Sequence, residues 1–157
     1  MTVALRLAIL GAIAVVVCSG AAAGRDRTAA EAQTRVDHHL RQAEPLVRHF
    51  EARLAAGCPR FATAAEWSAY LDGEVHRLVL LLAHLGEAWT EARQTGDDDV
   101  RRSAKSPRKR HQESALELLR AVQACAAEHG STLPTGALRE RIEREVPQRR
   151  AEIALPQ

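Results

Sequence analysis

The sequence predicts an all-α protein, an antiparallel up-down bundle of about four helices that follows an N-terminal signal segment. Three observations support this fold class. Beyond residue 24 the chain is rich in Ala, Leu, Glu and Arg, which favour helix, and only 3% of the whole sequence is aromatic. Apolar residues recur at intervals of three and four, which is the helical period. Most predicted connections are short, as expected for antiparallel neighbours in a bundle.

The first 23 residues have the three parts of a secretory signal peptide. Arg6 supplies positive charge, residues 7–17 form an unbroken apolar run, and residues 21–23 (Ala-Ala-Ala) offer a small-residue cleavage site. Export would leave residues 24–157 as a single helical domain in the periplasm or outside the cell.

Two other interpretations of this N-terminal segment remain open. The uncharged stretch 7–24 is close to the lower limit of about 17 residues for a bilayer-spanning helix, and Arg25 and Arg27 follow it. The segment would then be an uncleaved anchor, with the domain on the extracytoplasmic side. Lipidation of Cys18 is the other alternative, although Val17 stands where lipoprotein signals usually carry a small residue. Membrane attachment is expected only if the segment is retained or lipidated.

The first predicted helix covers roughly Thr28 to Ala56. Pro45 lies inside it, so we expect a kink or a split there. Gly57 and Pro59 predict its end. Its apolar seam is spaced 4-3-4-3-4 and consists of Val36, Leu40, Ala43, Val47, Phe50 and Leu54.

The second predicted helix has the clearest start. Thr63 and Glu66 fit a capping box, in which each side chain accepts the backbone N–H of the other residue. The stretch 78–82 is apolar on all sides, which is typical of a helix buried by several neighbours. We therefore expect this helix to be central and to end at Gly96. Its apolar stripe consists of Trp67, Leu71, Val75, Leu78, Leu82, Leu85 and Trp89.

The third helix is predicted to begin at Ser106 and Pro107, because Ser is a good cap and Pro is favoured at the first helical position. Its seam runs from His111 to His129, before Gly130. A fourth segment follows from Thr135, with Leu138, Ile142, Val146 and Ile153 on one face and Pro147 expected to bend it or end it early.

Two cysteines remain if Cys18 leaves with the signal, and an even number in an oxidising compartment predicts a disulfide. In an up-down-up arrangement the first and third helices end at the same pole of the bundle. Cys58 lies just past the end of the first helix, and Cys125 lies about one turn before the end of the third. The alternative is two separate buried thiols.

Seven histidines raise the question of a metal site. No two of them have the spacing of three or four residues that chelation along one helix requires. Asp72 and His76 have it, and with His84 they are the candidate metal ligands, although a pair such as the first two is more often a surface hydrogen bond. No cofactor is predicted, because the motifs for haem attachment and for an inward di-iron centre are missing.

Residues 97–111 are predicted to form a basic linker between helices. Three aspartates (97–99) precede six cations: Arg101, Arg102, Lys105, Arg108, Lys109 and Arg110. The net charge of only +2 and the lack of interleaved aromatic residues argue against a nucleic-acid partner. Either the linker is simply solvated, or the cations contact an anionic lipid or another acidic polymer of the envelope.

The sequence carries no recognisable motif for nucleophilic, metal-assisted or phosphate chemistry. We therefore expect a non-enzymatic, exported binding module of the cell envelope, whose partner is another protein or an anionic surface. A helical bundle that binds a metal or a small ligand is the alternative.

Overall fold

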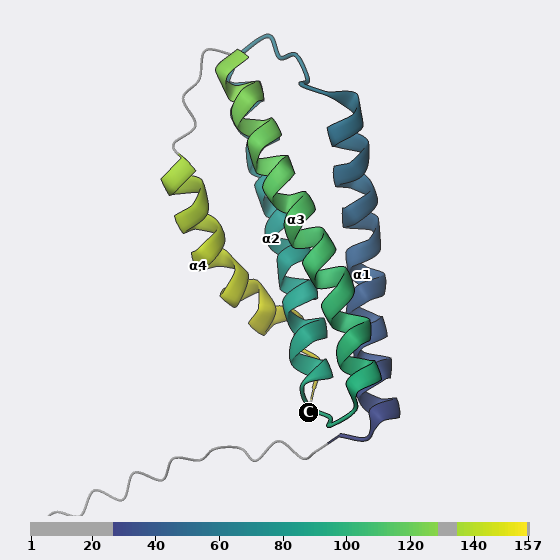
Figure 1. Ribbon diagram of the computed structural model, residues 1–157. Coiled ribbons are helices and arrows are strands. Elements are labelled where there is room, and N and C mark those ends of the chain that lie inside the picture. The colour runs from purple at the N-terminus through teal and green to yellow at the C-terminus, as the bar shows by residue number, and fades with distance from the viewer. Residues whose placement is uncertain (1–26, 129–134, 157) are drawn as a thin grey trace, which may run out of the picture.

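The computed structural model describes residues 27–128 and 135–156 (Figure 1). These residues form four helices and no strand: α1 (Ala29–Ala56), α2 (Ala64–Ala92), α3 (Asp98–Glu128) and α4 (Thr135–Ile153). Successive helices run in opposite directions, so the predicted all-α up-down bundle is confirmed. The expected signal segment and His129 lie outside the described residues.

Helix α1 is continuous across its proline. Thr28 caps it, and Thr28 and Glu31 complete a capping box that the sequence also contains. Of the kink or split expected at Pro45, the split is wrong, because the helix runs unbroken to Ala56, while the kink stays a prediction. Pro45 is exposed, whereas Ala43 and Phe50 on either side of it are buried in the core. Packing on both sides of the proline therefore offsets the hydrogen bond that it removes.

Helix α2 is the central helix, as predicted, because it packs against each of the other three. The capping box of Thr63 and Glu66 is present at its start. The helix ends at Ala92, and a turn over residues 93–97 replaces the expected last turn. Its buried apolar residues are Trp67, Val75, Leu78, Val79, Leu81, Ala83, Leu85, Ala88 and Ala92.

Helix α3 begins eight residues before the predicted start at Ser106, so the expected basic linker is wrong: residues 98–111 are helical. The side chain of Asp97 accepts the backbone N–H groups of Asp99 and Val100 at 2.9 and 3.0 Å, which is what an N-cap does. Asp98 and Asp99 add negative charge to the first turn, where the helix dipole favours it.

Buried apolar residues stabilise the part of α3 that precedes Pro107. Pro107 therefore lies inside the helix rather than at its first position. Val100 is 4% exposed and Ala104 is fully buried, and both belong to a small core cluster with residues of α1 and α2. A proline inside a helix costs about 3 kcal/mol relative to alanine. The cap and the buried cluster together offset that cost.

Helix α4 packs chiefly on α2 (Figure 1). Leu138 lies against Val75 and Val79, with Val146 beside them. The early end expected at Pro147 is wrong, since α4 continues to Ile153.

Polar contacts fix the C-terminal end of the chain. Arg150 donates to Glu87 of α2 at 2.7 Å. It lies so close to α2 that a Cβ at Gly86 would be 3.0 Å from its Nε. Arg35 of α1 donates to two backbone carbonyls of residues 155–156 at 2.9 and 2.8 Å. The chain end is therefore held across two helices.

Cys58 and Cys125 form the predicted disulfide, with Cα atoms 5.3 Å apart. The bridge joins the loop after α1 to the last turns of α3, at the pole that the topology predicts. Three aromatic rings lie close together beside it: Phe61, Trp67 and Tyr70. We call this end of the bundle the disulfide pole.

Candidate functional site

The six predicted cations lie on the first four turns of α3. At 100° per residue, five of them fall within an arc of about 120°, and the centre of this arc lies about 140° and 100° around the helix from the buried Val100 and Ala104. Arg102, Lys105 and Lys109 are exposed, and the other two are half-buried. These five residues, named the basic face below, are Arg101, Arg102, Lys105, Arg108 and Lys109. Helical folding thus concentrates charges that a linker would have dispersed.

Part of this charge is neutralised within the chain. Arg101 lies 3.6 Å from Asp98, and Arg102 pairs with Asp99. The Arg108 guanidinium lies 5.7 Å from the centre of the Trp89 ring, which holds it against α2 and keeps its charge. In the described ranges 27–128 and 135–156, Lys105, Lys109 and Arg110 form no ion pair.

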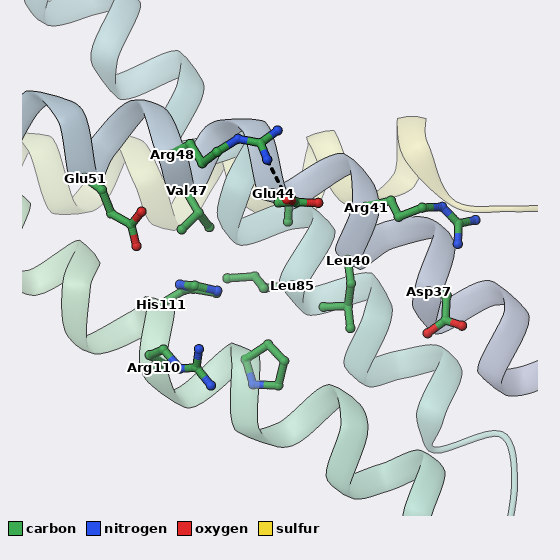
Figure 2. Close-up of a pocket in the computed structure, with 12 residues that line it drawn as sticks. Asp37, Leu40, Arg41, Glu44, Val47, Arg48, Glu51, Leu85, Arg110 and His111 are labelled. Carbon is green, nitrogen blue, oxygen red and sulfur yellow. Dashed lines mark hydrogen bonds and ion pairs between the residues drawn. The ribbon is translucent and has the colours of Figure 1, made fainter.

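Arg110 points away from the basic face, into a groove of about 430 Å³ between α1 and α3 (Figure 2). The floor of the groove is apolar. Leu85 of α2, only 1% exposed, forms its deepest part, so the groove reaches the core. The remaining floor residues are Leu40, Ala43, Val47 and Pro107, and the polar rim comprises Asp37, Arg41, Glu44, Arg48, Glu51, Arg110 and His111.

Charges of both signs surround the groove. Glu44 and Arg48 pair with each other at 2.5 Å along the α1 edge. Glu51 of α1 and His111 of α3 face each other across one end (Figure 2). Burial lowers the pKa of His111, as does the neighbouring Arg110, while Glu51 opposes the shift. His111 is therefore neutral at pH 7, and Arg110 is the unpaired cation of the α3 edge.

The three candidate metal ligands do not come together. Asp72 is exposed and pairs with Arg141 of α4. His76 is exposed, and His84 is 7% exposed and faces α1. His84 lies about 18 Å along the helix from Asp72, at 1.5 Å per residue. Among the residues that the structure describes, no three His, Cys, Asp or Glu side chains are grouped so that they could hold a metal ion.

His84 has a different partner, which the sequence did not suggest. The Nδ1 atoms of His39 and His84 lie 3.2 Å apart, and His39 is completely buried. Burial lowers the pKa of His39 to about 4, and the nearby His84, His38 and Arg35 add to the effect. Burial and His38 also lower the pKa of His84. Both rings are therefore neutral at pH 7, one donating its Nδ1–H to the other.

Nε2 of His39 is buried without a hydrogen-bond partner. Because an orphaned buried N–H is rarer than an orphaned acceptor, we assign the proton of His39 to Nδ1. His39 then donates to His84, which carries its own proton on Nε2.

The buried carboxylates of α2 are matched by cations. Glu91 is 4% exposed and pairs with Arg27 and with Arg35, whose nitrogens lie 2.9 and 3.0 Å from its two oxygens. Glu74, also 4% exposed, lies 3.3 Å from the guanidinium of Arg77 and 2.7 Å from Nε2 of His49. These groups stabilise the helix interfaces, in contrast to the unpaired cations of α3. We call the end of the bundle with Glu91, Arg27, Arg35, His39 and His84 the polar pole.

Comparisons with known proteins give no relative: no protein-family model, no curated protein and no solved structure matches the chain. Within residues 27–128 and 135–156, no helix has the length and apolar character needed to cross a bilayer. The geometry of α3 and of the groove beside it is therefore the guide to function.

Proposed function

We propose that this protein is a non-enzymatic binding module of the cell envelope that contacts an anionic membrane surface through the basic face of α3. One observation carries the proposal: exposed cations are concentrated on one side of one helix, and among the residues that the structure describes no acidic side chain pairs with Lys105 or Lys109. Near an anionic membrane each such residue contributes about 1 kcal/mol of attraction.

The compartment in this proposal is the periplasm or the exterior of the cell. The disulfide between Cys58 and Cys125 fits an oxidising, extracytoplasmic space. The signal-like composition of residues 1–23 agrees with export. In that space the anionic partners are lipid head groups rather than nucleic acids. Metal binding remains the alternative, and elemental analysis of protein purified without chelators tests it.

Vesicle sedimentation tests the proposal with a triple variant, Arg102→Gln, Lys105→Gln and Lys109→Gln. These side chains are exposed, so the fold should tolerate the changes. The parent protein should sediment with vesicles that contain phosphatidylglycerol and stay in solution with phosphatidylcholine alone. Loss of three charges should weaken binding about a hundredfold. Binding of the parent should also fall steeply with added salt, because exposed charges are screened.

A matched control removes three cations from α4: Arg139→Gln, Arg144→Gln and Arg149→Gln. The net charge changes by the same amount, but these arginines lie beside glutamates of their own helix. The control should bind like the parent. Equal losses in both triple variants would mean that net charge alone matters. That result, or a parent that ignores anionic vesicles, would overturn the proposal.

A further inference from the structure

The dimensions of the groove between α1 and α3 restrict what it can hold. Its lining on α1 runs from Asp37 to Glu51, which is about 21 Å at 1.5 Å per residue. Its volume is about 430 Å³. A helix of about 10 Å diameter and the same length occupies about 1,600 Å³. The groove therefore cannot enclose a partner helix, whereas its length and volume suit one extended hydrocarbon chain.

The length of the groove also agrees with a lipid chain. One leaflet of a bilayer has a hydrocarbon depth of about 15 Å, half of the roughly 30 Å core. An acyl chain of that length fits within the lined stretch of α1. The floor offers only apolar atoms from Leu40, Val47 and Leu85, so no buried polar group would lose a partner when a chain displaces water.

Arg110 connects the groove to the basic face. It belongs to the same cationic stretch as Lys109 but lines the groove edge. In the described part of the chain no acidic group pairs with it, whereas Arg48 on the opposite edge is paired with Glu44. A head group with negative charge at this edge would meet Arg110 first and the basic face next.

We infer that the α1–α3 groove takes up one acyl chain of an anionic membrane lipid, whose head group binds Arg110. This inference rests on the proposed function, because contact of the basic face with the membrane would bring the lipid to the groove. The hydrocarbon chain lies along Leu40, Val47 and Leu85, and the phosphate accepts hydrogen bonds from the guanidinium of Arg110. The module would then hold a single lipid as well as touch a membrane.

The test uses monomeric lysophosphatidylglycerol and its zwitterionic counterpart lysophosphatidylcholine, with Val47→Phe to fill the groove. The parent should bind the anionic lysolipid more tightly than the zwitterionic one. Arg110→Gln should remove that preference, with about a fivefold loss for the anionic lysolipid. Val47→Phe should abolish binding of both lysolipids, while it still sediments with anionic vesicles through the intact basic face.

A second measurement avoids dependence on the folding of Val47→Phe. A spin label at the end of the acyl chain should broaden the methyl resonances of Leu40, Val47 and Leu85 in the parent protein. Val146→Phe on α4, outside the groove, should bind the lysolipid like the parent. Unbroadened groove methyls, or a parent that ignores lysolipid monomers but sediments with anionic vesicles, would overturn the inference and leave the surface proposal standing.

Discussion

The two ends of the bundle are held together by different chemistry. At the disulfide pole, a covalent bridge and three aromatic rings join α1, α2 and α3. At the polar pole, the buried pair of His39 and His84 and the ion pairs of Glu91 join α1 to α2 and to the chain end. The stability of the disulfide pole therefore depends on the redox state of its cysteines, whereas the stability of the polar pole depends on pH.

Acid and reductant should therefore loosen different ends of the bundle. Apolar contacts and a disulfide do not change between pH 7 and pH 4, whereas a neutral imidazole pair does. The basic face and the groove begin near the polar pole, because α3 starts there. If acid loosens the polar pole, the proposed binding surface should therefore be affected before the disulfide pole.

Breaking the disulfide should cost the protein more stability than any other change. The double variant Cys58→Ala and Cys125→Ala should lose about 4 kcal/mol of unfolding free energy, since the bridge closes a loop of 67 residues. Denaturant titration measures the loss, and hydrogen exchange should accelerate most at the ends of α1 and α3. The parent in reductant should behave like the variant. Equal stability with and without the bridge would contradict the comparison of the two poles.

Acid should weaken the polar pole next. The folded pKa of His39 is about 4, against 6.5 in an unfolded chain. Between these values the unfolded state takes up a proton that the folded state refuses, so stability is full above pH 6.5 and falls towards pH 4. A shift of this size amounts to about 3 kcal/mol. Urea unfolding at a series of pH values measures this slope.

Two variants isolate the contribution of the imidazole pair. Replacing both His39 and His84 by Leu should remove most of the slope of the stability profile between pH 6.5 and pH 4, and the half-buried His111 should account for part of what remains. His76→Gln, at an exposed position, should leave the profile unchanged. Should the double variant not fold, the NMR titration of His39 in the parent gives the same answer. A midpoint near 6.5 would contradict the structure.

The sequence predicted the features that depend on helix direction and period. The disulfide followed from the even number of cysteines and from topology, because two parallel helices end at one pole. The start of α3 was missed because Ser106 and Pro107 resemble a helix start more strongly than Asp97 does. Yet Asp97, an acidic first turn and the apolar pair Val100 and Ala104 four residues apart were also readable. Two competing start signals cannot be ranked without knowing which residues are buried.

The pairing of His39 with His84 could not be predicted in the same way. Local spacing identifies ligands on one helix, whereas these two residues are 45 positions apart. The sequence did hold a partial signal: His39 continues the 4-3-4 pattern of Ala32, Val36 and Ala43, which marks the buried face of α1. Which residue of α2 meets it depends on the relative rotation and register of two helices, and periodicity does not fix either.

Removing one cap at each pole should have a smaller effect. Thr63→Ala removes the cap of α2 at the disulfide pole, and Asp97→Ala removes the cap of α3 at the polar pole. Each should cost about 1 kcal/mol in thermal or denaturant unfolding. Hydrogen exchange should rise in the first turn of the affected helix alone. An Asp97→Ala variant with the parent's stability would favour a start of α3 at Ser106.

The ion pair between Asp72 of α2 and Arg141 of α4, which lies between the poles, should contribute least to stability. The Asp72 side chain is 68% exposed, so water already solvates it well and the pair gains little. Asp72→Asn should lower the unfolding free energy by less than about 0.5 kcal/mol, and high salt should erase even that difference. Denaturant titrations at low and high salt measure both effects. A loss above about 2 kcal/mol would mean that exposed charges, rather than the apolar contacts of Leu138 and Val146, attach α4 to the bundle.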